Sequence, residues 1–162
     1  MKTLLLVRHA KSSRDDPALP DKERPLNERG MRDAPKVGER LSEQGVKPDL
    51  ILSSPAVRAL ATAEIIARKL GYKVKDIVVD ERLYATTPDN LLRVIRKIGD
   101  KSKRVMLFGH NPEFTELAHR LSSDIADMPT CAIAEFRFDT KKWSDVGNVE
   151  PAESTLDGPG KL

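Results

Sequence analysis

The protein has 162 residues, of which 39% are hydrophobic, 33% are charged and 4% are aromatic. This length suits one ordinary domain, and the apolar fraction supports one core and is too high for a disordered chain. A net charge of +3 is weak evidence for a nucleic-acid partner, because most charged faces are merely solvated. The charge is also uneven: the segment from Ser144 to the end carries −3, and the chain up to Trp143 carries +6.

Several classes of protein are excluded by what the sequence lacks. The single cysteine, Cys131, excludes an intramolecular disulfide framework and a Cys-rich zinc site. The first apolar run, Thr3–Val7, is shorter than the core of a signal peptide, and Arg8 follows it directly. No stretch approaches the roughly 20 apolar residues of a membrane span. We therefore expect a soluble, cytoplasmic protein with no membrane partner.

Short aliphatic runs alternate with helical patterns along the chain, which is typical of α/β proteins. The expected strands cover residues 4–7, 49–53, 77–79, 104–108 and 132–138. The expected helices run from the N-cap Asn27 to near Gly45, from the N-cap Ser54 to Gly71, over residues 90–98, and from the N-cap Asn111 to Leu121.

The first expected helix has an internal irregularity. Its apolar residues are roughly in phase and predict one buried face, formed by Met31, Ala34, Val37 and Leu41. Pro35 and Gly38 lie inside this pattern. Because proline lacks an N–H donor and clashes with the preceding turn, they predict a kink or a broken turn.

The C-terminal segment differs in composition from the rest of the chain. Residues 144–162 contain Gly, Pro and Ser, little apolar material and an excess of acidic residues. Such a segment is typically mobile or loosely attached to the surface. We therefore expect a single domain over residues 1–143 and an acidic, flexible tail over residues 144–162.

Basic and imidazole side chains follow three of the expected strands. Arg8 and His9 follow the first strand, Ser54 and Arg58 follow the second, and His110 follows the fourth. Ligands of open α/β sheets bind at the carboxyl ends of the strands, where helix N-termini and arginines favour anions. A lone buried histidine is more often a structural residue, and a lone arginine a surface charge. Four such residues at three strand ends predict an anion site.

These residue types suit phosphoryl transfer through a histidine nucleophile. A neutral imidazole nitrogen can attack phosphorus in line while cations stabilise the equatorial oxygens. Arg8 and Arg58 are expected to lower the pKa of His9 and so keep it unprotonated near neutral pH. If arginines supply the positive charge, no metal or other cofactor is required.

The motifs at the strand ends resemble those of the histidine phosphatase superfamily, which has the phosphoglycerate mutase-like fold. Within that superfamily the short chain is similar to the bacterial phosphohistidine phosphatases of the SixA type, over roughly residues 2–143. The motifs that carry the resemblance are Arg8-His9-Ala10, Pro25-Leu26-Asn27-Glu28-Arg29-Gly30, Ser53-Ser54-Pro55 with Arg58-Ala59 and Thr62-Ala63, Gly109-His110-Asn111-Pro112, and Met128-Pro129-Thr130.

The resemblance implies a three-layer α/β/α fold with a mostly parallel mixed sheet. It implies that His9 is the nucleophile and that Arg8, Arg58 and His110 bind the phosphoryl group and stabilise its transfer. Ala10 replaces the commoner glycine of the family triplet, a change between two small residues. Larger relatives carry a proton-donating carboxylate after the third strand, and residues 81–86 offer no clear equivalent. Glu81 is more readily explained as a surface residue.

The lack of a clear proton donor affects which class of substrate is favoured. An alkoxide leaving group needs a general acid, whereas imidazole leaving from a phosphoramidate needs far less help. Phosphohistidine in signalling proteins, for example in a phosphotransfer domain, is therefore the favoured substrate. A small phosphomonoester or sugar phosphate is the alternative. A phospho-binding module without turnover is a third possibility, disfavoured because such a module would not need the nucleophile.

Other residues invite functional readings that the pattern around them does not favour. Cys131 and Arg137 have the Cys-x5-Arg spacing of cysteine-dependent phosphatases, but residues six apart on a strand lie about 20 Å apart. His119 lies well inside the fourth helix and is expected to pack or face solvent rather than bind a metal.

The loop after His9 leaves its charged residues open to two readings. Lys11 and Arg14 either widen a positive rim or are surface charges, and Asp15-Asp16 either borders the site or forms a solvated turn. The turn with Lys101, Lys103 and Arg104 has no interleaved aromatic residues, so we expect no nucleic-acid partner.

Overall fold

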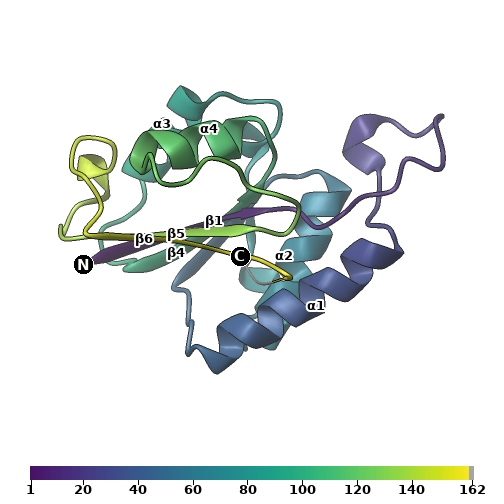
Figure 1. The fold of residues 1–162 in the computed structure, drawn as a ribbon, viewed down its shortest axis with the longest axis horizontal. Helices are drawn as coiled ribbons and strands as arrows, with labels where there is room; N and C mark the ends of the chain where they lie inside the picture. Colours follow the sequence, from purple (N-terminus) through teal and green to yellow (C-terminus); the bar gives the residue numbers. More distant parts are fainter. Residues whose placement is uncertain (161–162) are drawn as a thin grey trace.

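The structure is a computed structural model that describes residues 1–160, in which six strands form one sheet (Figure 1). The strands are β1 (Lys2–Arg8), β2 (Leu50–Ser53), β3 (Val78–Val79), β4 (Arg104–Gly109), β5 (Ile133–Phe138) and β6 (Glu153–Asp157), in the order β3-β2-β4-β1-β5-β6. The pairs from β3 to β1 are parallel, and β5 and β6 extend the sheet by antiparallel pairing. The predicted mostly parallel mixed sheet is confirmed.

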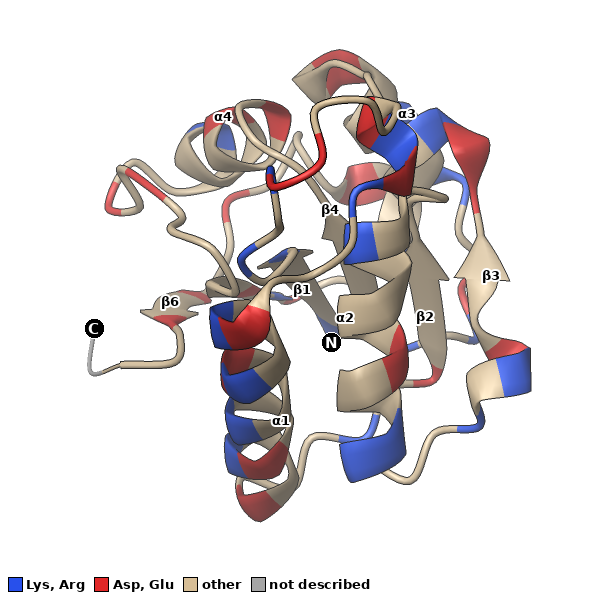
Figure 2. Ribbon diagram, turned by 90° about the vertical axis from the view of Figure 1, so that its right-hand side faces the viewer, with Lys and Arg blue, Asp and Glu red and all other residues tan. Residues whose placement is uncertain are grey.

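Four helices cover the two faces of the sheet: α1 (Glu28–Glu43), α2 (Val57–Lys69), α3 (Pro88–Arg96) and α4 (Glu113–Leu121). α1 and α2 lie side by side on one face, and α3 and α4 cover the other (Figures 1 and 2). Each pair of helices shares a hydrophobic core with its face of the sheet. The predicted three-layer arrangement is therefore confirmed. Within residues 1–160, no helix is long and apolar enough to span a membrane.

β1 is the central strand, and its side chains fill both cores. Leu4 and Leu6 pack with α3 and α4, whereas Leu5 and Val7 pack with α1 and α2. A strand covered on both faces reads as a continuous apolar run, which is why it was recognisable from sequence. Since β1, β2 and β4 run parallel, the residues that follow them meet at one edge of the sheet.

α1 is one uninterrupted helix of 16 residues, so no turn is broken at Pro35. The Oδ1 atom of Asn27 accepts a hydrogen bond from the backbone N of Gly30 at 2.9 Å, as expected of its N-cap. Met31, which was expected to face the core, is 55% exposed. Because Pro35 has no N–H, the carbonyl oxygen of Met31 lacks its hydrogen bond within the helix. Met31 lies on an exposed side of α1, where water can bond to this oxygen instead.

The other helices begin or end within two or three residues of the predicted positions. α2 begins at Val57 rather than Pro55, and no side chain caps it. α3 begins at Pro88 with Thr87 as its N-cap and ends at Arg96. α4 begins at Glu113, and the side chain of Asn111 accepts a hydrogen bond from the backbone N of Thr115 at 3.1 Å.

The prediction of a loosely attached tail is wrong for residues 153–157, because they form β6 and pair with β5. Arg40 of α1 also donates hydrogen bonds to the Asp157 carboxylate at 2.9 Å and to the carbonyl oxygen of Gly158. An edge strand is held mainly by backbone hydrogen bonds, so a polar composition does not prevent it from forming. Lys161 and Leu162 lie outside the residues that the structure describes.

Gly30 lets the first turn of α1 pack against the loop after β1, and we predict that Gly30→Ala destabilises the protein. An added Cβ would lie 2.2 Å from the carbonyl oxygen of Lys11, which already accepts a hydrogen bond from the Asn27 N–H at 3.0 Å. We expect the free energy of unfolding, measured by urea denaturation, to fall by about 1–3 kcal/mol. Gly99→Ala is the control, because a Cβ there meets no atom within 4 Å. Equal stability of both variants would contradict the prediction.

Candidate active site

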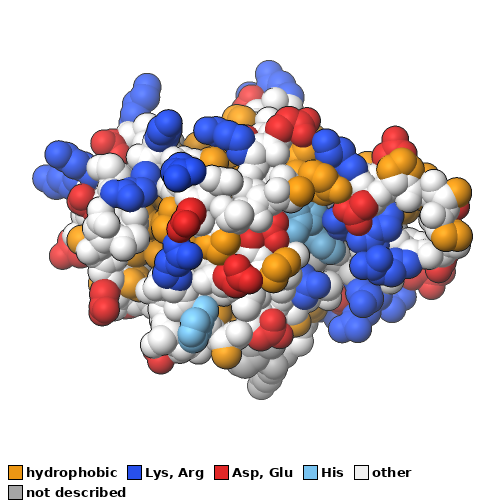
Figure 3. Space-filling view, turned by 90° about the horizontal axis from the view of Figure 1, so that it is seen from above, with side chains coloured by type: hydrophobic (Ala, Val, Ile, Leu, Met, Phe, Trp, Pro, Cys, Tyr) orange, Lys and Arg blue, Asp and Glu red, His pale blue; other side chains and the backbone are white. Residues whose placement is uncertain are grey.

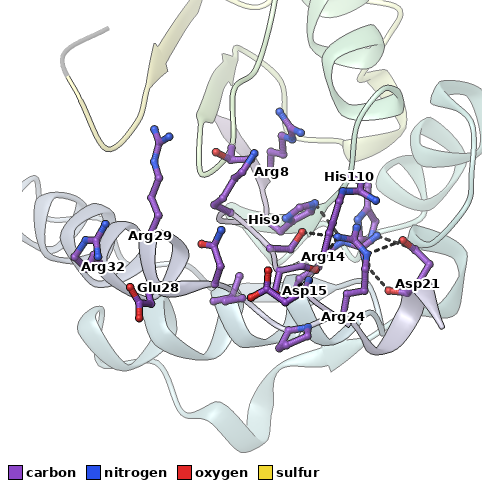
Figure 4. A pocket seen from close by; sticks show the side chains of 18 of the residues that line it. Arg8, His9, Arg14, Asp15, Asp21, Arg24, Glu28, Arg29, Arg32 and His110 are labelled. Atoms are coloured by element: carbon purple, nitrogen blue, oxygen red, sulfur yellow. Dashed lines mark hydrogen bonds and ion pairs between the residues drawn. The ribbon is translucent and has the colours of Figure 1, made fainter. Parts of the chain in front are cut away.

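The carboxyl ends of β1, β2 and β4 open into a cavity of about 1060 Å³. All four residues singled out from the sequence, Arg8, His9, Arg58 and His110, line this cavity. Figure 4 shows Arg8, His9 and His110 within it. The rings of the two histidines lie 5.2 Å apart between centroids. The sheet topology thus brings together the side chains that its three strand ends supply.

His9 is held in one tautomer by the backbone. Its Nδ1 atom lies 2.7 Å from the carbonyl oxygen of Ala10, and a carbonyl oxygen can only accept, so Nδ1 carries the proton. Nε2 is therefore unprotonated and accepts a hydrogen bond from Nε of Arg58 at 3.3 Å. The Ala10 N–H in turn donates to the hydroxyl of Thr62 on α2 at 3.0 Å. His9 presents a lone pair to the cavity beside a guanidinium group.

Burial keeps both histidines neutral. It is the main cause that lowers the pKa of His9 from 6.5 to about 4, and Arg58, Arg8 and Arg24 lower this pKa further. Burial likewise lowers the pKa of His110 to about 3, followed by the effects of His9 and Arg58. The predicted direction of the His9 shift agrees with the structure, but desolvation contributes more than the neighbouring arginines.

His110 is oriented by Ser54. The Nε2 atom of His110 lies 2.7 Å from the hydroxyl of Ser54, which also accepts a hydrogen bond from the Ala56 N–H at 3.2 Å. Ser54 was expected to cap α2, but its hydroxyl instead connects β2 to His110. The edge of the Tyr84 ring packs against His110, with 5.5 Å between the ring centroids.

Two buried nitrogen atoms of the described chain have no hydrogen-bond partner and belong to this group: Nε of Arg8 and Nδ1 of His110. The rest of Arg8 is fixed, since its Nη1 donates to the carbonyl oxygen of Met128 at 3.0 Å. The same oxygen accepts a hydrogen bond from the side chain of Asn111 at 2.9 Å. Buried polar atoms are rarely left unpaired, so these two nitrogens suit a ligand with several acceptor oxygens.

Asp21 joins the site without having been predicted from the sequence. Its Oδ2 accepts hydrogen bonds from Nη2 of Arg58 at 2.9 Å and from the Tyr84 hydroxyl at 2.7 Å, and its Oδ1 from Nε of Arg24 at 3.1 Å. Its carbonyl oxygen accepts a further bond from Nη1 of Arg58 at 2.7 Å. The Tyr84 hydroxyl, then Arg58 and Arg24, hold the pKa of Asp21 well below its ordinary value. Asp21 is therefore ionised and fixes Arg58.

Asp21, Arg24 and Tyr84 are the residues of the site that sequence reasoning missed. Asp21 and Arg24 lie in the long loop between β1 and α1, and Tyr84 follows β3. Their contacts depend on how two loops fold over the cavity, and the hydrophobic periodicity of the sequence does not predict loop conformation. The only local signal is the opposite charge of Asp21 and Arg24 at a spacing of three residues.

The remaining candidates divide between the cavity and the rest of the molecule. Lys11, Arg14 and Asp15 line the cavity. The Glu81 carboxylate is 73% exposed and pairs with Lys22 at 3.2 Å, which agrees with a surface residue. The buried carboxyl of Glu113, whose pKa burial raises, is not among the cavity-lining residues within the described chain.

His119 and Cys131 take structural places. The Nδ1 atom of His119 lies 2.9 Å from the carbonyl oxygen of Ile125, away from the cavity. No group of three or more His, Cys, Asp or Glu side chains in the part of the chain described here is arranged to hold a metal ion. Cys131 is fully buried, and burial raises the pKa of its thiol to about 12. Arg137 instead pairs with Glu135 at 3.2 Å.

The chain is similar in sequence to a known family and to proteins of other organisms. Residues 4–85 match the sequence model of the histidine phosphatase superfamily (branch 1). An uncharacterized chloroplastic protein of Arabidopsis thaliana is 32% identical over 165 residues, covering 97% of this chain and 72% of that protein. An uncharacterized protein of Mycobacterium tuberculosis is 32% identical over 163 residues, covering 94% of this chain and 97% of that protein.

A solved structure extends the comparison to the fold. The crystal structure of a proposed phosphohistidine phosphatase, SixA from Agrobacterium tumefaciens, has a TM-score of 0.77 and 28% sequence identity. The superposition covers 83% of this chain and 90% of that one. The predicted phosphoglycerate mutase-like fold is thereby confirmed.

The neutral histidines predict a pH dependence of stability. Because the pKa values of His9 and His110 fall from 6.5 in the unfolded chain to about 4 and about 3 in the folded protein, the unfolded state binds more protons between these values. The stability that the neutral rings contribute is complete above pH 6.5 and is lost as the pH falls toward 4 for His9 and toward 3 for His110. We expect the free energy of unfolding to fall by about 1 kcal/mol or more per pH unit in this range.

Urea denaturation across this pH range checks the prediction. A variant with both His9→Gln and His110→Gln should lose most of this slope, whereas His119→Gln retains both site histidines and should keep it. The same slope in the double variant and the wild type would contradict the assignment.

The Asp21 carboxylate raises the pKa of Tyr84, chiefly by accepting its hydrogen bond, with a smaller effect of burial. We predict that Asp21→Asn lowers the pKa of Tyr84 toward its ordinary value of 10.0. A titration of phenolate ultraviolet absorbance measures this shift, with Tyr72 as the only other tyrosine of the chain. Glu23→Gln changes an exposed carboxylate of the same loop and should leave the titration unchanged. Identical curves for Asp21→Asn and the wild type would contradict the contact.

Proposed function

Because the chain belongs to the histidine phosphatase superfamily and is a phosphatase, we propose that His9 is its nucleophile and that phosphohistidine in a protein is its substrate. In this proposal the phosphoryl group passes first to Nε2 of His9 and then to water. Arg8, Arg58 and His110 bind the phosphoryl oxygens. The observation that carries the proposal is the fixed tautomer of His9, whose Nδ1 bonds to the Ala10 carbonyl oxygen at 2.7 Å.

The first step forms a bond between phosphorus and Nε2 of His9 as the bond from phosphorus to the substrate nitrogen breaks. The lone pair on Nε2 supplies the electrons, and Nδ1 keeps its proton through the bond to Ala10. A phosphohistidine ring can hold a proton on its second nitrogen, so it leaves as neutral imidazole without a proton from the enzyme. Water then attacks phosphorus, and the bond from phosphorus to Nε2 breaks with its electron pair returning to Nε2. The protons of the water leave with inorganic phosphate and the solvent, and His9 is again a neutral imidazole protonated at Nδ1.

Charge around the site supports the transfer of a dianionic group. The guanidinium groups of Arg8 and Arg58 and a ring nitrogen of His110 offer donors to the oxygens, on which negative charge is concentrated in phosphoryl transfer. Loss of one preorganised donor of this kind typically raises the barrier by about 3–4 kcal/mol. Asp21 holds Arg58 through two of its nitrogens, at 2.7 and 2.9 Å, so the fork is positioned before substrate arrives.

The ionised state of Asp21 favours phosphohistidine over phosphate esters. An ester requires a general acid to protonate its leaving alkoxide. Asp21 is the carboxylate bonded to Arg58, and its low pKa makes it a hydrogen-bond acceptor rather than a proton donor. Imidazole is a much better leaving group than an alkoxide, so a site with this carboxylate suits a phosphoramidate bond. The SixA-type neighbour is described as a proposed phosphohistidine phosphatase, which supports the same choice.

Substitution of the nucleophile tests the mechanism. We predict that His9→Ala lowers kcat by about 10⁴-fold or more, since the residual rate then depends on binding and charge alone. The wild type should accumulate a phosphoenzyme that is labile in acid and stable in base, as expected of a phosphoramidate, and His9→Ala should not. His119→Ala is the control, because that histidine lies outside the cavity. Retained turnover in His9→Ala would remove the nucleophile assignment.

A panel of substrates tests the substrate class separately. The wild type is incubated with phosphohistidine-containing phosphotransfer proteins and with small phosphomonoesters and sugar phosphates, and phosphate release is measured. We expect the highest kcat/KM for the phosphohistidine proteins. Efficient turnover of alkyl phosphates with phosphohistidine protein left intact would favour the small-molecule alternative.

A further inference from the structure

A group of four basic side chains lines the same cavity beside the proposed catalytic residues. We call Lys11, Arg14, Arg29 and Arg32 the basic rim. All four residues are exposed. Figure 4 shows Arg29 and Arg32 on α1, at the opposite end of the view from Asp21. Arg14 lies between Asp21 and these two arginines. With a volume of about 1060 Å³, the cavity is larger than a single phosphoryl group requires.

The cations of the basic rim are largely unpaired. No carboxylate within residues 1–160 lies within 4.0 Å of the charged nitrogens of Lys11, Arg14 or Arg32. Arg29 forms one ion pair among the described residues, with Asp33 of its own helix at 3.4 Å. By contrast, Arg24 and Arg58 are both committed to Asp21. The unpaired charges are thus available to a partner.

The backbone holds the basic rim in place. Lys11 packs against Gly30 at the first turn of α1, next to Arg29, through the hydrogen bond from the Asn27 N–H to its carbonyl oxygen at 3.0 Å. The Ser13 N–H donates to the carbonyl oxygen of Pro25 at 2.8 Å, directly before Arg14. The two backbone segments that carry the rim are therefore joined to each other.

The chemistry of the lining favours a macromolecule over a small ligand. Small-molecule sites are mostly apolar and enclose most of the ligand surface. Here Pro25 and Leu26 are the apolar members of the lining, and the rim side chains are exposed. Space filling shows Lys and Arg side chains gathered at the surface beside histidine (Figure 3). Exposed charges at the edge of an interface steer an oppositely charged partner and raise its association rate.

A protein surface fits this lining better than a nucleic acid. No Phe, Tyr or Trp is among the described lining residues, and Tyr84 is already packed against His110 and bonded to Asp21, so the rim offers bases no aromatic stacking platform. Two carboxylates, Asp15 and Glu28, also line the cavity near the rim and leave it a net charge of +2. Alternating signs of this kind match a folded surface of mixed, predominantly acidic charge. They match a uniformly charged phosphate backbone less well.

Resting on the proposed function, we propose that the basic rim binds acidic side chains of the protein substrate that lie beside its phosphorylated histidine. The phosphoryl group then enters the end of the cavity formed by Arg8, His9, Arg58 and His110, while Asp and Glu residues of the substrate contact the rim. The rim acts on encounter and selection of the substrate, and not on the chemical step.

Two peptides of equal length test the selection. Each contains one histidine phosphorylated with phosphoramidate, flanked by Asp and Glu in one peptide and by Asn and Gln in the other. At low salt we expect kcat/KM to be about 10-fold higher for the acidic peptide, with the ratio decreasing as NaCl rises to about 0.2 M. Equal kcat/KM for both peptides at low salt overturns the proposal.

Matched variants assign the selection to the rim. With Lys11, Arg14, Arg29 and Arg32 all changed to Gln, the ratio between the peptides should fall to about one. The control changes four exposed lysines outside the cavity to Gln, with the same loss of charge, and should keep the ratio: Lys73, Lys75, Lys97 and Lys101. If the ratio falls equally in both variants, the preference for the acidic peptide depends only on net charge, and the proposal is overturned.

A binding measurement separates the rim from the proposed function. Fluorescence anisotropy of a labelled, unphosphorylated acidic peptide reports binding without turnover, and the rim variant should bind it about 10-fold more weakly than the wild type. If phosphohistidine peptides are not hydrolysed but this difference is found, the proposed substrate fails and the rim remains an acidic-peptide site. If the variant and the wild type bind equally, the rim proposal fails whatever the substrate. Tighter rim-dependent binding of fructose 1,6-bisphosphate or of an oligonucleotide also overturns it.

Discussion

The hydrogen bond between Nδ1 of His9 and the carbonyl oxygen of Ala10 sets the chemistry of the whole site. It fixes the proton on Nδ1, so Nε2 is unprotonated and accepts a hydrogen bond from Nε of Arg58. The bond depends on the path of the chain directly after β1, which the hydrogen bond from the Ala10 N–H to Thr62 of α2 secures. The central strand, the first helix pair and the nucleophile are therefore coupled through one short segment of backbone.

The protonation states of the residues in the site suit one class of reaction. Burial, more than the arginines, keeps His9 and His110 neutral, and a carboxylate held ionised by Tyr84, Arg58 and Arg24 positions the guanidinium. A neutral nucleophile repels an anionic substrate less than a thiolate or carboxylate would. The same carboxylate cannot act as a general acid while it accepts these hydrogen bonds. Both features favour a phosphoryl group on a leaving group that needs little protonation.

The sequence was sufficient to predict the parallel strands of the sheet and the residues at their carboxyl ends, because buried parallel strands appear as aliphatic runs whose carboxyl ends share one edge. It could not predict Asp21 or Tyr84, since these come from loops whose meeting depends on tertiary packing. Ser54 was assigned to a helix cap because Ser before Pro favours that reading, and its contact with His110 requires the register of β2 against β4. β6 was missed for a related reason, because an edge strand can form from backbone hydrogen bonds with little apolar sequence.

The position of β6 explains where the acidic residues of the C-terminal segment lie in the fold. Two of the four acidic residues of the C-terminal segment form ion pairs with arginines of the domain: Asp157 with Arg40 at 2.9 Å and Glu153 with Arg137 at 3.6 Å. Neither of these arginines lines the cavity. The acidic segment thus neutralises cations elsewhere on the surface and, among the described residues, forms no ion pair with the basic rim. A small net charge is compatible with a strongly positive site, because opposite charges are separated in space and the field at the cavity depends on its nearest charges.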